Sequence, residues 1–185
     1  RGVPARWPWA LAVDVLGGCR LERDGAPLDP GPKPPTRSLD ILQALALARD
    51  HSCRVEELQD WFWPDADGDR AKAACEQALH RLRRLLGRSD LVLQREGRLR
   101  LAPDKVWVDL DDWEDRLRQG MTEAGPDPDR LILDVPGPVQ SRGGDAGWLL
   151  PAADRLRDRL LDLALQLGRR HEQLGDAGRA RRLYL

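Results

Sequence analysis

The stretch between Asp69 and Leu86 restricts the possible folds of this chain more than any other. Apolar residues recur there at the i, i+3, i+4 and i+7 spacing that places them on one face of an α-helix. They are Ala71, Ala74, Cys75, Ala78, Leu79, Leu82, Leu85 and Leu86. Gly87 follows, and glycine commonly ends helices because it adopts the left-handed conformation without strain. The pattern therefore predicts a helix over 69–86 with one buried and one exposed face.

A strand and two shorter helices are expected before this helix. Residues 11–21 favour a strand that bends at Gly17-Gly18. Thr36 follows a Pro-rich loop and is expected to cap the first helix. The second helix is predicted over 55–63, and Pro64 ends it. The apolar faces of these two helices contain Leu39, Leu42, Leu45, Ala46, Val55, Leu58, Trp61 and Phe62.

The residues after the helix 69–86 predict a β-hairpin and then further helices. The hairpin spans 91–101, about five residues in each arm, with its turn at Glu96-Gly97. A short helix is predicted over 110–119, and residues rich in Pro and Gly follow it. An amphipathic helix after Pro151 and a partner helix from Ala177 then form a helical hairpin.

Together these elements predict an α+β fold in two parts. A winged helix-turn-helix domain is expected over 11–109, because a helix, a turn, a basic helix and a basic hairpin follow one another. An all-α region is expected over 110–185, and residues 1–10 are interpreted as a tether. Since the last helical pattern stops at Leu185, we interpret the chain as part of a longer protein.

The total charge of the chain hides a separation of charge along it. Lys and Arg number 30 and Asp and Glu 31, which gives a net charge of −1. The segment 70–102 has 9 basic and 3 acidic residues, a net +6, whereas 103–134 has 4 basic and 10 acidic residues, a net −6. A uniformly basic surface is therefore excluded, and a local basic surface on the helix and the hairpin is predicted.

The exposed face of the predicted helix carries side chains of the types that contact DNA in other proteins. Arginine pairs with guanine, glutamine suits adenine, and outer Lys and Arg side chains bind phosphates. The hairpin, with Arg95, Arg98 and Arg100, is expected to reach a flanking minor groove. Arg83 is expected to lie toward the core and to pair with an acidic residue such as Glu57. The predicted DNA-binding residues are Lys72, Gln77, His80, Arg81, Arg84, Arg88 and Arg98.

The order of the elements resembles the bacterial transcriptional activator domain family, in which an OmpR-type winged helix precedes tetratricopeptide-like repeats. The stretches that carry the resemblance are Trp63-Pro64-Asp65, Leu79-His80-Arg81-Leu82-Arg83-Arg84-Leu85-Leu86-Gly87 and Val106-Trp107-Val108-Asp109-Leu110. The opening Trp7-Pro8-Trp9 and the run 63–69 look similar to the C-terminal region of MalT-like ATPase regulators. The residues similar to the helical activator region are Gly137-Pro138, Trp148-Leu149, Leu174-Gly175-Asp176, Ala180 and Tyr184.

The resemblance implies a bacterial transcription activator that binds double-stranded DNA and takes part in signal transduction. RNA polymerase or other domains of the same regulator are the protein partners that it implies, and any nucleotide-hydrolysing domain would lie upstream of these residues. Three positions depart from the family pattern. Ala78 replaces a usual His, Val135 replaces a frequent aromatic residue, and Ala73 replaces a frequent Arg, which puts one DNA contact in doubt.

Several other chemistries are not expected. Asp65, Asp67, Asp69 and Glu76 have the spacing of calcium ligands, but Arg70 stands where an EF-hand loop needs Gly. We interpret this run as an acidic turn in which Asp69 caps the helix. The three cysteines and the aromatic run 61–63 are interpreted as core residues, the latter in preference to base stacking.

The sequence gives no support for an active site or a membrane segment. The three His residues have no partner at the spacing of a catalytic triad, and no Gly-rich phosphate-binding loop is present. We therefore expect no enzymatic activity, cofactor or metal in this chain. No apolar stretch approaches the ~20 residues of a membrane helix. Three cysteines without a disulfide framework indicate a reducing cytosol, so a cytoplasmic protein is expected.

Other interpretations of the basic helix stay open. Its charged face could simply be solvated, and His80 could be a surface residue with no role. A protein-interaction module could use the winged-helix shape without reading DNA. In that case the acidic segment 103–134 could fold over the basic helix and inhibit it. A nucleotide-sensing enzyme would need a pocket that the sequence does not indicate.

Overall fold

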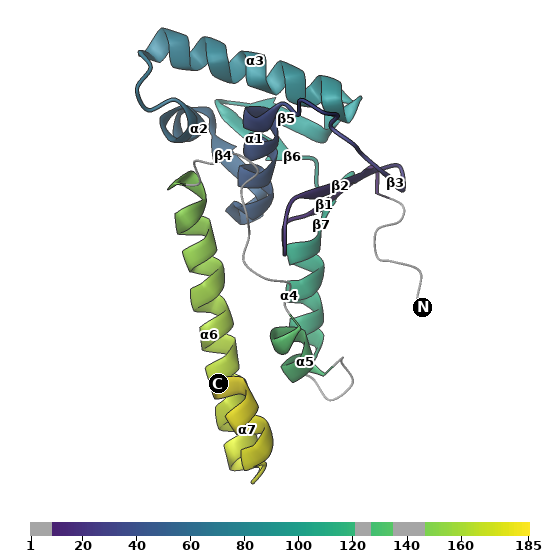
Figure 1. Cartoon of the computed structure of the whole chain (residues 1–185), viewed down its shortest axis with the longest axis vertical. Coiled ribbons are helices and arrows are strands. Elements are labelled where there is room, and N and C mark those ends of the chain that lie inside the picture. The colour runs from purple at the N-terminus through teal and green to yellow at the C-terminus, as the bar shows by residue number, and fades with distance from the viewer. Residues whose placement is uncertain (1–8, 121–126, 135–146) are drawn as a thin grey trace.

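Figure 1 shows the computed structural model of the chain, which describes residues 9–120, 127–134 and 147–185. The first eight residues of the predicted tether lie outside the described residues, as do Val135 and Gly137-Pro138. A first sheet, three helices with a second sheet, and a helical extension follow one another along the chain. This order confirms the α+β fold class.

The first sheet has four strands in the order β3-β2-β1-β7. β1 (Leu11–Asp14), β2 (Arg20–Arg23) and β3 (Ala26–Pro27) form an antiparallel meander where one bent strand was predicted. The bend lies at Gly17-Gly18, as predicted, and both glycines have positive φ angles. β7 (Val106–Val108) returns to this sheet and pairs parallel with β1. The sequence did not predict β7, because so short a strand has no recognisable periodicity.

Helices α1 (Thr36–Leu47), α2 (Val55–Phe62) and α3 (Gly68–Leu86) follow the first sheet along the chain. A 3-10 turn, η1 (Arg49–His51), and a strand, β4 (Ser52–Arg54), connect α1 to α2. The apolar residues predicted for α1 are all buried, and α3 packs on both α1 and α2. Helix α1 therefore buries the face that its spacing indicates, whereas α2 buries only Leu58 and Phe62 of its predicted set.

The two predicted helix caps are wrong. Thr36 is the first residue of α1, and Pro35 occupies the cap position. At α3 the cap is Asp67, whose carboxylate accepts a hydrogen bond of 2.9 Å from the backbone N–H of Arg70. The helix therefore begins before Asp69. Capping residues are recognised by composition, but the position is decided by where the backbone turns into the helix.

The aromatic run 61–63 is only partly in the core. Phe62 is 2% exposed, whereas Trp61 is 42% exposed, which corrects the prediction that it packs inside. Trp63 is half-buried and packs against the core edge-on to Phe62. Consecutive residues of a helix point about 100° apart, so Trp61 and Phe62 cannot share one buried direction.

The second sheet has the order β4-β6-β5. A 3-10 turn, η2 (Ser89–Leu91), leads from α3 into β5 (Val92–Arg95), which pairs antiparallel with β6 (Arg98–Leu101). The turn at Glu96-Gly97 is confirmed, with φ angles of 49° and 72°. Two positive φ angles are typical of the two-residue hairpin turns that match strand twist. Each arm has 4 residues instead of the predicted five.

The helical extension contains α4 (Asp109–Gly120), α5 (Pro128–Leu133), α6 (Leu150–Gln173) and α7 (Ala177–Tyr184). α4 packs on β1 and β7, and α5 packs on α4 and α6. The sequence did not predict α5, which has only 6 residues. Figure 1 shows α7 folded back along the lower end of α6, which is the predicted helical hairpin. None of the described helices is long and apolar enough to cross a membrane.

The extension is attached to the remainder of the chain at two places. The 3-10 turn η3 (Gly147–Leu149) inserts Trp148 and Leu149 into the hydrophobic core. At the start of α4, the Asp109 carboxylate accepts hydrogen bonds of 2.8 Å and 2.9 Å from the backbone N–H groups of Val15 and Leu16. The starts of α4 and of α6 are thus both fixed to residues distant in sequence.

Candidate nucleic-acid interface

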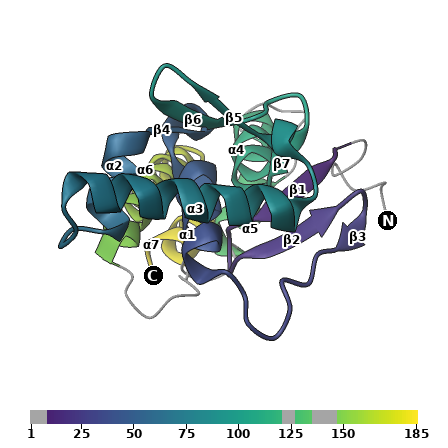
Figure 2. The ribbon, with the colours of Figure 1, turned by 90° about the horizontal axis from the view of Figure 1, so that it is seen from above.

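Helix α3 presents one buried and one open face. Its buried residues are Ala71, Cys75, Ala78, Leu79, Leu82 and Leu86, all within the predicted set. Figure 2 shows α3 lying over α1 and α2, with no other element above it. The predicted DNA-binding residues of the helix are all exposed: Lys72, Gln77, His80, Arg81 and Arg84. The structure therefore brings five of the seven predicted site residues onto one open helical face.

The positive charges of this face are free of internal counterions. In the described part of the chain, Lys72, Arg81 and Arg84 form no ion pair. Arg70, at the first turn, instead pairs with the capping residue Asp67 at 3.2 Å. Unpaired cations on an open helical face are available to phosphates or base edges.

Arg88 differs from the other predicted residues because it already has a partner. Its guanidinium donates to both oxygens of Asp90, over 3.2 Å and 3.1 Å. Lys105 reaches the same carboxylate at 2.9 Å. The hydrogen bonds from Arg88 and Lys105 hold the pKa of Asp90 well below its usual range. Arg88 lies at the end of α3 with much of its charge compensated locally.

Two residues outside the predicted set hold α3 in place. The Ser38 hydroxyl of α1 is buried and donates to the backbone carbonyl of Ala78 over 2.8 Å. At the other end, the Arg23 guanidinium of β2 donates to the carbonyls of Leu85 and Leu86, over 3.5 Å and 3.4 Å. A cation is favoured there because the C-terminus of a helix has negative partial charge. The sequence held no signal for Arg23, which lies 62 residues before its nearer partner in the chain.

The predicted pairing of Arg83 with Glu57 is wrong. The Arg83 guanidinium donates instead to the backbone carbonyl of Val92 over 3.3 Å, at the start of β5. Glu57 accepts a hydrogen bond of 2.8 Å from the backbone N–H of Arg54, three residues before it. Arg83 thus lies toward the core side, as expected, and links α3 to the hairpin.

A small hollow beside α3 extends the basic surface. It has a volume of about 320 Å³ and lies between the start of α1 and the open face of α3, where Gln77 and Arg81 line it. Arg37 of α1 lines it too, with its guanidinium 5.7 Å from the centre of the Phe62 ring. The sequence analysis did not single out Arg37, because no pattern connects the first helix to the third.

Arg98 is not placed with the α3 residues. It lies directly opposite Arg54 of β4, and its guanidinium donates to the Ser52 hydroxyl over 3.2 Å. Side chains directly opposite one another share a face of the sheet. The other face carries the buried residues Cys53 and Leu99, which belong to the core beneath α3. Arg98 therefore belongs to the outer face of the second sheet.

The described residues of the acidic segment, 103–120 and 127–134, do not cover the basic helix in this structure. Helix α4 packs on the first sheet, and α5 packs on α4, α6 and α7. Figure 1 shows α4 and α5 at the end opposite to α3. The described part of the segment is thus not folded over α3.

Two further kinds of site to consider among the described residues are a metal site and a reactive thiol. No three His, Cys, Asp or Glu side chains among them are placed to share a metal ion. Cys19, Cys53 and Cys75 are buried, as predicted, and form no disulfide among the described residues. Burial raises the pKa of the Cys75 thiol to about 11. A thiol that stays protonated is not a nucleophile.

Comparison with known proteins identifies the fold. No family model matches the sequence, and no curated protein matches it. The structure resembles that of Mycobacterium tuberculosis EmbR in complex with a low affinity phosphopeptide, with a TM-score of 0.66 and 21% sequence identity. The match covers 91% of this chain and 47% of the EmbR chain, so the chain spans about half the length of that relative. The chain therefore shares the fold of EmbR over nearly all of its length.

Proposed function

We propose that this chain binds double-stranded DNA, with α3 in the major groove. The observation that carries the proposal is the open face of α3, where Lys72, Arg81 and Arg84 form no ion pair with any described residue and Gln77 is exposed. A helix of 19 residues is about 28 Å long, enough to lie along a groove. Arg81 and Gln77 suit base edges, and Lys72 and Arg84 suit the flanking phosphates.

We place this activity in a bacterial transcription regulator. The resemblance of the sequence to transcriptional activators supports this proposal, as does the fold shared with EmbR. We further propose that residues 110–185 are a tetratricopeptide-like region that binds another protein, such as RNA polymerase or another domain of the same regulator. The paired helices α6 and α7 support this, as do the exposed leucines Leu161 and Leu165, one turn apart on α6.

A binding assay with matched variants tests the DNA proposal. Duplexes are first selected from a random library, and their affinity is then measured at two salt concentrations. Arg81→Ala/Arg84→Ala is expected to weaken binding at least tenfold and to reduce the salt slope by about 2, because each arginine loses a base or phosphate contact. Arg181→Ala/Arg182→Ala removes two exposed arginines of α7 and is the control, with affinity unchanged.

Two results would contradict the proposal. The chain could show no salt-dependent affinity for any duplex, which favours a protein-interaction module of winged-helix shape. Alternatively, both double variants could lose the same affinity, which indicates an unspecific attraction between charges. A shift of the base preference by Gln77→Ala, with total affinity little changed, would support direct reading of the groove.

A further inference from the structure

A buried hydroxyl group joins the first helix to the middle of α3. Ser38 of α1 is 2% exposed, and its hydroxyl donates to the backbone carbonyl of Ala78 over 2.8 Å. A carbonyl inside a helix already accepts the main-chain hydrogen bond that holds the helix together, so the bond from Ser38 is an additional one. Its effect is therefore on how α3 lies against α1, and not on whether α3 forms.

The Ser38 bond reaches α3 at the turn that carries the proposed base contacts. Gln77 directly precedes Ala78, and Arg81 follows it by three residues, so both lie within about one turn of the bonded carbonyl. Ser38, Gln77 and Arg81 also line the hollow of about 320 Å³ beside the open face. The part of α3 that Ser38 holds is thus the part from which these two side chains project.

Apolar packing opposes movement of this part of α3 only weakly. From the start of the helix to its middle, the buried residues are all small: Ala71, Cys75 and Ala78. Small side chains form shallow ridges, and hydrophobic attraction has no direction, so neither strongly opposes sliding or turning of the helix. A hydrogen bond does oppose it, because the bond weakens steeply when its length and angle change. Ser38 thus supplies a directional contact where packing lacks one.

Reading of bases needs more exact placement of α3 than binding of phosphates does. A turn of the helix by about 20° moves atoms at its surface, about 6 Å from the axis, by about 2 Å. A hydrogen bond to a base edge does not tolerate a shift of that size. Lys and Arg side chains have long stems and can still reach phosphates, which carry no sequence information. A turned helix would therefore lose discrimination between base pairs before it loses affinity for DNA.

We propose that Ser38 is a positioning residue for base recognition. Through the Ala78 carbonyl it fixes the rotation of α3 that directs Gln77 and Arg81 toward base edges. The inference rests on the proposed function, since it concerns how the same helix reads DNA. Ser38 is buried and acts only through α3, so the pattern of exposed basic residues in the sequence gives no sign of it.

The test measures base discrimination by the whole chain, as the ratio of its affinities for a selected duplex and for duplexes with one base pair replaced. Gln77→Ala and Arg81→Ala first identify the base pairs that these side chains read. At those base pairs, Ser38→Ala is expected to lower discrimination about threefold or more. The affinity for a duplex of random sequence, and its salt slope, should change less than about twofold, because the phosphate contacts remain.

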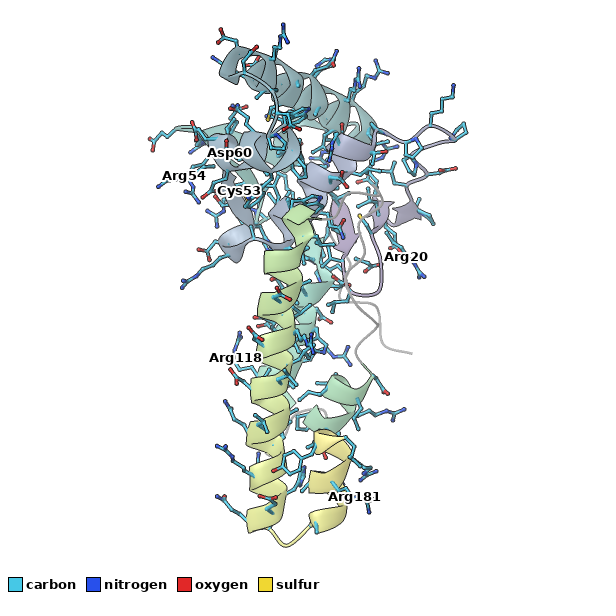
Figure 3. All side chains as sticks on the ribbon, turned by 60° about the vertical axis from the view of Figure 1, so that its left-hand side comes forward. Arg20, Cys53, Arg54, Asp60, Arg118 and Arg181 are labelled. Atoms are coloured by element: carbon cyan, nitrogen blue, oxygen red, sulfur yellow. The ribbon has the colours of Figure 1, made fainter. Side chains whose placement is uncertain are left out.

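Cys53→Ala is the matched control for Ser38→Ala. It also removes a buried polar atom beside α1, since the Cys53 sulfur lies 4.0 Å from the carbonyl of Ala44, and Figure 3 shows Cys53 below α3. Denaturant unfolding records the stability of each variant, and base discrimination should be unchanged in Cys53→Ala. Ser38→Cys has a similar size and a weaker donor, so it should show a smaller loss of discrimination and replaces Ser38→Ala if that variant folds poorly.

A double-mutant cycle separates positioning from a general loss of stability. Once Gln77 is replaced by alanine, Ser38→Ala should lower discrimination no further at the base pair that Gln77 reads, because no reading side chain is left there to misplace. If Ser38→Ala lowers it equally in both backgrounds, or if Cys53→Ala lowers it as much, Ser38 is not a positioning residue.

Two further results overturn the inference while leaving DNA binding intact. Ser38→Ala could keep full discrimination where Gln77→Ala and Arg81→Ala lose it. Alternatively, the unchanged chain could discriminate between base pairs while neither Gln77→Ala nor Arg81→Ala has an effect. If the unchanged chain binds no duplex at all, the DNA proposal itself fails, and this inference fails with it.

Discussion

The indole of Trp148 packs edge-on against the ring of Phe62, with the ring centroids 5.1 Å apart and an angle of 66° between the planes. Phe62 ends α2, and Trp148 belongs to the turn that starts α6. Both rings lie in the same core. The contact therefore fixes the long helix of the extension to the helix that precedes α3.

Removing this contact should destabilise the whole winged helix. Trp148→Ala is expected to lower the free energy of unfolding by about 3–5 kcal/mol, because it leaves a cavity beside Phe62. Trp61→Ala is the control, since Trp61 is 42% exposed and should cost less than half as much. Denaturant unfolding measures both. Equal losses would mean that Trp148 does not pack in the core.

A histidine links the loop after α1 to α4 and should make stability depend on pH. His51 Nε2 lies 2.7 Å from Asp111 Oδ2, and Nδ1 lies 3.0 Å from the carbonyl of Ala46. Acceptors at both nitrogens suit the doubly protonated ring. Burial lowers the pKa of His51, but the hydrogen bond and charge of Asp111, with the Ala46 carbonyl, outweigh it and raise the pKa above 6.5.

Since the folded-state pKa is raised, this stabilisation is complete below pH 6.5 and is lost as the pH rises through the folded-state pKa. Asp111→Asn should therefore lower the free energy of unfolding by about 0.5–1 kcal/mol near pH 6 and by much less near pH 9. Asp115→Asn, on the same helix, should show no such difference between the two pH values. A constant effect of Asp111→Asn would contradict the ionic link.

Helices α6 and α7 meet at a glycine. A Cβ atom added to Gly168 would overlap the ring of Tyr184, so the ring would have to move away from α6. Gly168→Ala is expected to cost about 1–3 kcal/mol of packing and to increase hydrogen exchange of the α7 amides. Gly178→Ala is the control, because it places Ala in an exposed helix where propensity favours it. If hydrogen exchange of the α7 amides were unchanged in Gly168→Ala, the close contact between Gly168 and Tyr184 would be contradicted.

The like charges of Arg54 and Arg98, which lie directly opposite one another in β4 and β6, should reduce the stability of the second sheet. Arg54→Thr removes the like charge opposite Arg98 and introduces a residue that favours strands. We expect the free energy of unfolding to rise by about 0.2–1 kcal/mol, and the gain to shrink at high salt, which screens the repulsion. Arg20→Thr, in the first sheet, tests whether threonine alone stabilises a strand. A loss of stability in Arg54→Thr would show that the arginine makes favourable contacts.

Local periodicity was enough to predict the main helices. The spacing from Ala71 to Leu86 specifies a buried face, and that face is buried in the structure. Gly87 and the turn at Glu96-Gly97 were also predictable, because the backbone needs positive φ at both sites. These features depend on neighbours along the chain, so they can be read from a short window of sequence.

Features that depend on distant residues could not be predicted. β4 and β7 have 3 residues each and exist only because β6 and β1 lie beside them. The same holds for Arg23 at the end of α3, since its partners come from a remote segment. Trp61 is exposed because the other elements pack on the side of α2 that carries Leu58 and Phe62.

The sequence by itself determined that this chain has an amphipathic basic helix followed by a hairpin, because helical spacing and turn residues act over a few positions. Only the tertiary structure decided how the charges are grouped. It left Lys72, Arg81 and Arg84 of α3 without an ion pair among the described residues, placed the acidic helices at the opposite end, and put Arg98 opposite Arg54. Strand register places side chains on a common face, and register is fixed by pairing between segments that are far apart in the chain.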